Sequence, residues 1–261
     1  MSSILPFLPH TLAKRVERYR ELRRLGLSAG DAASAVISAS AWSSFLEARL
    51  DLLPDGFKQK AKCIVDVGAN RGDWSSSVLQ FLRPQRLIAL EPNPPVFDGL
   101  VKRLQSESAA KVLNVAASSQ PGELPFHITG GSQCASLLKP AGGMVDLYGG
   151  DFAEEKTITV RVDTLDRLLA ECPLISLLKI DVQGYEREAL AGAHEVLKKT
   201  QLVLIEANYV SHYDNDIQFP ELHALMNAHG FSLAGLSRPF VKQGRALWAD
   251  ALYRNFSLLP F

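Results

Sequence analysis

The sequence predicts an α/β fold built on a mostly parallel sheet and preceded by an N-terminal helical extension. From residue 61 onward, short apolar runs alternate with segments of helical spacing, which is the pattern of strands joined by crossover helices. Before residue 61 the apolar spacing is helical only. We therefore expect a helical extension over residues 1–60 and one domain over residues 61–261.

The composition is that of a soluble globular protein. The chain has 261 residues, 28 basic and 28 acidic side chains and a net charge of +0, and 47% of its residues are hydrophobic. A neutral chain lacks the broad positive field that grips nucleic acid or anionic lipid, so we expect no nucleic-acid partner. No apolar stretch approaches the ~20 residues of a transmembrane helix.

The cysteines predict a cytoplasmic protein. Cys63, Cys134 and Cys172 are too few and too scattered for a disulfide framework or a CxxC metal site. Residues 1–10 carry no charged leader before their apolar patch and so make a poor signal peptide. We expect three reduced thiols in the cytoplasm.

Two helices are predicted in the extension. Over residues 11–25, apolar side chains recur at helical spacing with arginines between them, which gives a basic amphipathic helix. A second helix is expected from Asp31, a candidate N-cap, to about residue 50. The basic helix is a lid, a contact in a homodimer, a membrane-surface anchor, or a solvated helix packed by one face on the main domain.

The main domain begins with three strands and two helices. The strands are expected at 63–68, 86–91 and 111–117, and the helices at 74–82 and from Pro94 or Pro95 to 104. Strands at 124–129 and 157–162 then flank a long glycine-rich loop, and such irregular connections are usually functional. The remaining elements are helices at 164–170, 186–197 and 220–228 and strands at 177–182, 202–207, 231–236 and 248–254.

The first strand ends in a glycine-rich turn. Gly68 permits a tight turn and Gly72 allows a close approach near the start of the next helix, where backbone N–H groups can meet a ligand. The spacing is G-x-N-x-G, which is neither the nicotinamide fingerprint nor a P-loop.

Two acids indicate which cofactor this turn serves. Glu91 ends the second strand, where a carboxylate can accept both hydroxyls of a ribose. Asp66 lies just before Gly68, where it would repel a pyrophosphate and attract a cation. This electrostatic argument favours S-adenosylmethionine, which carries a sulfonium and no phosphate. Asp66 could instead be a buried acid that accepts backbone N–H bonds.

A second group of polar residues follows later strands. Asp181 ends one strand before another glycine turn, so it is expected at the same edge of the sheet as Asp66 and to contact substrate or act as a general base. The alternative is a structural, capping acid. Glu206 ends the next strand, with His212 on the loop behind it.

The segments IVDVGANRGDWS and LLKIDVQGYEREALAGA resemble the FkbM-type methyltransferases, a branch of the class I S-adenosylmethionine-dependent fold. EPNP, RVDTLD and LVLIEANY are similar to that family's pattern as well. The resemblance implies a three-layer, Rossmann-like sheet of seven mostly parallel strands. It also implies O-methylation of a hydroxyl on a sugar, polyketide or glycolipid-type acceptor.

The resemblance also assigns residues. It places Asp66, Gly68, Asn70 and Gly72 around the methionine part of the cofactor, with Asp181 facing the same crevice. It places Glu91 on the ribose hydroxyls, Asn93 near the adenosine, and Ala116 and Ala117 near the adenine. Ser136, with Glu206, is expected on the substrate side.

Methyl transfer to an alcohol is helped by a base that removes the hydroxyl proton. The candidates, in descending order, are Asp181, His127 and His212. No compact metal-ligand motif is present, and we predict no metal site. The alternatives are a nicotinamide-dependent oxidoreductase and a non-catalytic protein that retains the fold.

Overall fold

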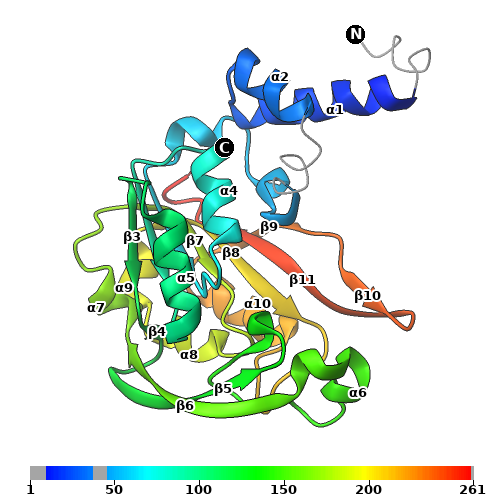
Figure 1. Cartoon of the computed structure of the whole chain (residues 1–261). Helices are drawn as coiled ribbons and strands as arrows, with labels where there is room; N and C mark the ends of the chain where they lie inside the picture. The colour runs from blue at the N-terminus through cyan, green and yellow to red at the C-terminus, as the bar shows by residue number, and fades with distance from the viewer. Residues whose placement is uncertain (1–9, 38–45, 260–261) are drawn as a thin grey trace.

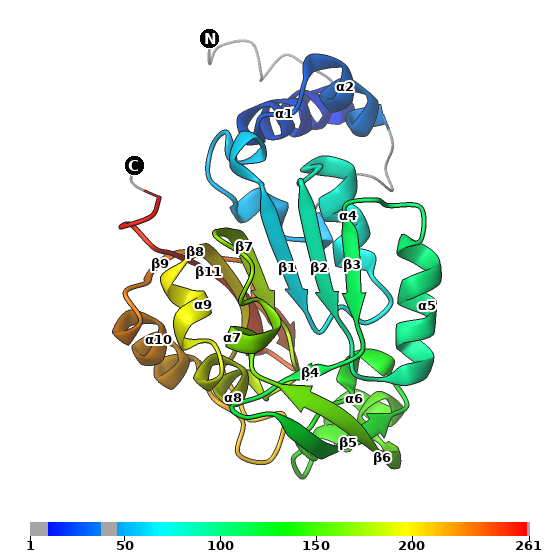
Figure 2. The same ribbon diagram turned by 90° about the vertical axis from the view of Figure 1, so that its left-hand side faces the viewer.

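The computed structural model describes residues 10–37 and 46–259 and contains a large, mostly parallel sheet between two layers of helices (Figures 1 and 2). In the described residues this sheet has eight strands, in the order β10-β11-β8-β7-β1-β2-β3 with β9 also paired to β11. The predicted three-layer α/β fold is confirmed, with one strand more than expected. The strands are β1 (Cys63–Val67), β2 (Arg86–Leu90), β3 (Ala110–Leu113), β7 (Ile175–Ile180), β8 (Thr200–Asn208), β9 (Ser232–Leu236), β10 (Phe240–Lys242) and β11 (Arg245–Arg254).

Helices cover both faces of the sheet because its central strands are apolar on both sides, as buried parallel strands are. One hydrophobic cluster joins one face to α4 (Asp73–Phe81) and α5 (Pro94–Leu104). A second cluster joins the other face to α7 (Leu165–Leu168), α8 (Glu186–Ala191), α9 (His194–Lys198) and α10 (Phe219–Ala228). Figure 2 shows these two sets of helices on opposite sides.

Strand direction brings polar residues together at one edge. The neighbours β3, β2, β1, β7 and β8 are parallel, so their carboxyl ends meet, while β11 runs antiparallel to β8. The register sets Asp66 opposite Lys179 and Glu206 opposite Asp250. The ligand-binding edge of an open α/β sheet is therefore rich in charged side chains.

A small second sheet lies below this edge. It has the order β4-β6-β5 and consists of β4 (Ala116–Ala117), β5 (Gly122–Thr129) and β6 (Glu154–Asp163). The predicted strand 111–117 is divided between the two sheets. Asn114 causes the break, because its side-chain amide donates hydrogen bonds to the carbonyl oxygens of Glu91 and Pro92.

The loop from residue 130 to 153 is more ordered than expected. It contains the short helices η4 (Ser132–Cys134), α6 (Met144–Tyr148) and η5 (Gly149–Phe152). An isolated bridge joins Pro140 to Tyr213, and another joins His127 to Ser136. The loop is therefore attached both to the small sheet and to the segment after β8.

Several boundaries differ from the predicted ones. The helix expected at 164–170 is only the four residues of α7, capped by Thr164. The helix expected at 186–197 is divided into α8 and α9 around Gly192, whose position leaves no room for a side chain. The strand β10 was not predicted.

The N-terminal helices pack on the main domain. They are α1 (His10–Leu25) and α2 (Ala29–Ile37), and residues 38–45 of the second predicted helix lie outside the described part of the chain. Leu22 and Leu25 are buried in the same hydrophobic cluster as α4 and α5. This supports a helix packed by one face on the domain. A homodimer through these helices stays a prediction.

Candidate active site

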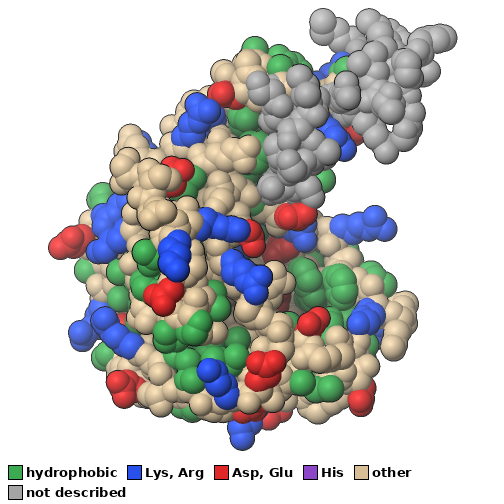
Figure 3. All heavy atoms as spheres, in the orientation of Figure 1, with side chains coloured by type: hydrophobic (Ala, Val, Ile, Leu, Met, Phe, Trp, Pro, Cys, Tyr) green, Lys and Arg blue, Asp and Glu red, His purple; other side chains and the backbone are tan. Residues whose placement is uncertain are grey.

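A cavity of about 870 Å³ lies at the carboxyl edge of the large sheet. Figure 3 shows this region as a hollow that holds acidic side chains beside a group of hydrophobic ones. The cavity runs from the turns after β1 and β2 to β8 and β11. Its wall includes the predicted site residues Gly68, Asn70, Glu91, Ala116, Ala117, Asp181, Glu206 and His212.

The turn after β1 forms the floor at one end. Gly68 has φ +80°, and a Cβ atom there would lie 1.9 Å from the carbonyl oxygen of Asp181. Only glycine permits this approach of the two strand ends. Asn70 also has a positive φ, 48°, and its side-chain amide donates to the carbonyl oxygen of Ser132 at 3.0 Å. That bond joins the turn to the loop that covers it.

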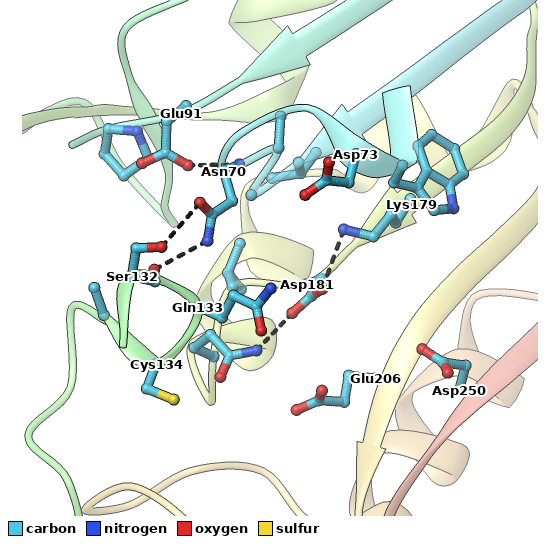
Figure 4. A pocket seen from close by; sticks show the side chains of 18 of the residues that line it. Asn70, Asp73, Glu91, Ser132, Gln133, Cys134, Lys179, Asp181, Glu206 and Asp250 are labelled. Carbon is cyan, nitrogen blue, oxygen red and sulfur yellow. Dashed lines mark hydrogen bonds and ion pairs between the residues drawn. The ribbon is translucent and has the colours of Figure 1, made fainter. Parts of the chain in front are cut away.

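Glu91 faces the cavity at the end of β2. Its two carboxylate oxygens accept backbone N–H groups from Asn70 and Asn93, each at 2.8 Å, and Figure 4 shows the first of these bonds. Burial raises the pKa of Glu91 to about 7, although these two N–H groups favour the charged form. Each oxygen keeps a lone pair, so the carboxylate can still accept hydroxyl groups from a ligand.

Asp66 is placed differently from the expectation. It is fully buried, accepts a hydrogen bond from the Ser75 hydroxyl at 2.6 Å, and lies 3.3 Å from the ammonium of Lys179. This position matches the alternative of a buried acid, with a hydroxyl and an ammonium as its partners. Asp66 therefore reaches the cavity only through Lys179.

Lys179 joins the buried Asp66 to the half-buried Asp181. Its ammonium lies 3.1 Å from Asp181, whose other oxygen accepts the Gln183 side-chain amide at 2.7 Å. Burial opposes the charge on Lys179, but Asp181 and Asp66 outweigh that effect and hold its pKa above the usual value. Asp181 thus faces the cavity and shares one ammonium with the buried Asp66 (Figure 4).

Glu206 and Asp250 continue the acidic row across the sheet. Asp250 is paired with Arg49, whose Nε lies 2.5 Å away. Burial, then the nearby Asp181, Glu186 and Asp250, raise the pKa of Glu206 well above its usual value. In the described part of the chain, no hydrogen bond or ion pair joins Glu206 to another side chain. Figure 4 shows its carboxyl group on the same side of the cavity as those of Asp181 and Asp250.

Aromatic side chains form the wall of the cavity beyond this row. Tyr148 stacks on Phe152 with centroids 4.7 Å apart, and Phe240 stacks on Trp248 at 5.5 Å. The Nε2 of His212 lies 2.8 Å from the Tyr148 hydroxyl, and its Nδ1 lies 3.0 Å from the carbonyl oxygen of Val210. The carbonyl must accept, so Nδ1 carries the proton and Nε2 accepts from Tyr148. Burial lowers the pKa of His212.

The other predicted site residues lie behind the wall. Gly72 begins α4 against Leu100, and the Asn93 side chain is buried with its Oδ1 unpaired. His127 is buried on the small sheet with Nδ1 3.2 Å from Glu154. Ser136 donates its hydroxyl to the carbonyl oxygen of Gln183 at 2.6 Å.

Several residues of the cavity wall were not predicted from the sequence. Lys179 lies inside the motif that carried the prediction, but only its pairing with Asp66, 113 residues away, gives it a role. Asp250 lies among the alternating apolar residues of β11, and an acid within such a strand could have indicated a site residue. Arg49 and the aromatic residues had no sequence signal.

Metal-binding side-chain groups and membrane-spanning helices are both absent from the described residues. Among the described residues, no group of three or more histidine, cysteine, aspartate or glutamate side chains is arranged to hold a metal ion. None of the described helices combines the length and apolar character needed to cross a membrane.

Comparisons with known proteins agree with the resemblance. Residues 66–233 match the family described as Methyltransferase FkbM domain. The 2-O-methyltransferase NoeI of Sinorhizobium fredii is 26% identical over 204 residues, which are 75% of this chain and 80% of that protein. Methyltransferase sdnD of Sordaria araneosa is 27% identical over 210 residues, 71% of this chain and 76% of that protein.

A solved structure is also similar. The crystal structure of Methyltransferase FkbM from Methylobacillus flagellatus KT superposes with a TM-score of 0.49 at 14% identity, over 92% of this chain. The chain spans 59% of the length of that protein.

Proposed function

This chain belongs to the FkbM methyltransferase family, and we propose that it transfers a methyl group from S-adenosylmethionine to a hydroxyl oxygen. The acceptor we propose is a small molecule or glycan of the sugar, polyketide or glycolipid type. The relative from Sinorhizobium fredii is named a 2-O-methyltransferase, which supports an oxygen acceptor.

The observation that carries the proposal is the setting of Glu91. A buried carboxylate at the end of β2, anchored by two backbone N–H groups and facing a cavity, suits the paired hydroxyls of a ribose. Ala116 and Ala117 line the cavity nearby and leave space for a flat base. Gly68 and Asn70 line the cavity beside Glu91, where we propose that the methionine part lies. Asn93 donates its backbone N–H to Glu91 from behind the wall, so we propose that it acts near the adenosine through that carboxylate.

S-adenosylmethionine supplies a methyl group on a positively charged sulfur. Asp181 is the acid of the cavity wall nearest to Gly68 across the strand ends, and we propose that it faces this charge. Because Asp66 is fully buried and Asp181 lines the cavity, we assign to Asp181 the electrostatic attraction first assigned to Asp66. The chain's own task is then to align the acceptor oxygen and to exclude water.

The remaining proposals concern partners and location. A neutral net charge supports a small-molecule or glycan acceptor and not a nucleic acid. The free thiols of Cys63, Cys134 and Cys172 support a cytoplasmic location.

The test is a binding titration by isothermal calorimetry with S-adenosylmethionine and, separately, with NADH. We expect saturable binding of S-adenosylmethionine only. Glu91→Ala should weaken it at least about tenfold, because a lost charged hydrogen-bond pair is worth about 1.5–3 kcal/mol. Glu123→Ala is the matched control, since Glu123 is exposed on β5. A folded protein that binds neither ligand would instead be non-catalytic.

A further inference from the structure

Three carboxyl groups, those of Asp181, Glu206 and Asp250, come from neighbouring strand ends at the carboxyl edge of the sheet, and among the described residues two of the three are paired with a cation. Asp181 follows directly after the Ile180–Ile205 pair of β7 and β8, which brings it beside Glu206, and Glu206 is opposite Asp250. Asp181 forms an ion pair with the ammonium of Lys179, and Asp250 forms one with the guanidinium of Arg49. Adjacent like charges destabilise a sheet, so the middle carboxyl has the strongest reason to hold a proton.

The three bases predicted from sequence are occupied. Asp181 is bound by Lys179 and Gln183, and His127 lies behind the wall. The ring of His212 uses Nδ1 to donate to a carbonyl and Nε2 to accept from Tyr148, so it has no free lone pair. Glu206 faces the same cavity without a hydrogen-bond partner among the described side chains.

We propose that Glu206 is the general base: its carboxyl group holds a proton in the free protein, releases it when a positively charged methyl donor binds, and then takes the proton of the acceptor hydroxyl. This inference rests on the proposed function. A positive charge near the row relieves the repulsion that keeps Glu206 protonated, so the base forms only when the donor is in place.

The reaction balances with this assignment. The acceptor oxygen forms a bond to the methyl carbon, the carbon–sulfur bond breaks with its electron pair on sulfur, and the hydroxyl proton moves to Glu206. The products are a methyl ether and a neutral thioether. Glu206 is left protonated, as it began.

Other groups around Glu206 define what a titration would report. Asp181 and Lys179 face it from β7, Asp250 with Arg49 from β11, and Glu186 from α8. Tyr148, Tyr213 and Cys134 line the same part of the cavity, and burial is the main cause that raises their pKa values. Their hydroxyls and thiol therefore stay protonated at neutral pH. The buried carboxyl groups of Glu206 and Glu186, whose pKa values burial raises, remain as the groups that a titration can report, and the Glu206→Gln variant separates their contributions.

The test counts the protons released on ligand binding, by calorimetry at pH 7 in buffers of different ionisation enthalpy. The two probes are S-adenosylmethionine and S-adenosylhomocysteine. Both carry the ribose that contacts Glu91, but only the first has a charged sulfur. We expect wild type to release up to about one proton more with S-adenosylmethionine than with S-adenosylhomocysteine.

Variants identify the group that releases this additional proton. Glu206→Gln should remove most of the difference while it still binds S-adenosylhomocysteine, which shows that the variant is folded. Glu206→Asp should keep it, and Glu123→Gln, an exposed control, should behave as wild type. The inference is overturned, while the proposed function stands, if wild type releases equal numbers of protons with the two probes. The same holds if the difference in released protons survives in Glu206→Gln. If wild type binds neither probe, the proposed function fails as well.

Discussion

At the scale of single residues, the site depends on carboxyl groups that the protein keeps in different states. Asp66 and Asp181 share one ammonium, Asp250 has a guanidinium, and Glu91 and Glu206 have no cation partner in the described structure. Burial raises the pKa of Glu91 to about 7 and the pKa of Glu206 well above its usual value, and it raises the pKa of Asp250 as well despite the guanidinium of Arg49. Glu91 and Glu206 differ from Asp250 in that both lack a cation partner among the described residues, which leaves them free for ligands.

Lys179 should be essential to this division. Lys179→Met leaves the buried Asp66 without its cation, and breaking a buried ion pair costs about 3–5 kcal/mol. We expect a loss of that size in the free energy of unfolding, measured in urea. Asp66→Asn combined with Lys179→Met should restore part of it. A free energy of unfolding of Lys179→Met within about 1 kcal/mol of the wild-type value would show that the ion pair contributes little stability.

The residue scale is also where sequence reasoning was least complete. Glu91, Asp181 and Glu206 were found because each ends an apolar strand. The orientation of Asp66 was not, because it depends on Lys179 from a strand that is distant in sequence and adjacent in the sheet. A pattern along one strand does not specify which charge the neighbouring strand supplies.

At the scale of elements, the parallel strands and the helices around them were predictable because their apolar spacing is local. The points at which predicted elements are interrupted were not predictable. The predicted strand 111–117 ends early because Asn114 reaches the carbonyl oxygens after β2, and the helix 186–197 is interrupted by the loop after β4. Both breaks have tertiary causes, which residue spacing does not record.

The helix break gives a prediction whose sign opposes helix propensity. A Cβ atom at Gly192 would lie 2.0 Å from the carbonyl oxygen of Ser118, so Gly192→Ala should lower the free energy of unfolding by about 1–3 kcal/mol. Gly99→Ala in α5 is the control. Among the described residues outside its own helical turn, no atom lies within 4 Å of a Cβ built there, so alanine should stabilise by about 0.5–1 kcal/mol. Urea unfolding compares the two variants, and equal stabilisation of both would refute the steric explanation.

At the scale of the whole molecule, buried carboxyl groups make stability depend on pH. Burial raises the pKa of both Glu91 and Glu186 from 4.5 to about 7. Between those values the native state holds protons that the unfolded chain has released. The free energy of unfolding of the ligand-free protein should therefore fall as the pH rises through this window.

Urea unfolding across this range of pH measures the effect. Each carboxyl contributes at most about 1.4 kcal/mol per pH unit. The double variant Glu91→Gln with Glu186→Gln should show a shallower dependence than wild type. An unchanged slope in the double variant would mean that other groups control the effect.

The cavity also shows why one molecule needs both sheets. The large sheet supplies the acids, while the small sheet and the loop over residues 130–153 supply the cover and part of the aromatic wall. Figure 4 shows Glu91 and Glu206 at different ends of the labelled set of residues, and we propose that the nucleoside lies near the first and the acceptor near the second.

A crystal structure with S-adenosylhomocysteine tests that placement most directly. The account predicts both ribose hydroxyl oxygens within about 2.5–3.0 Å of the Glu91 carboxylate, with the sulfur toward Asp181 and Glu206. Adenosine bound against Tyr148 and Trp248, with Glu91 free of the ribose, would contradict it.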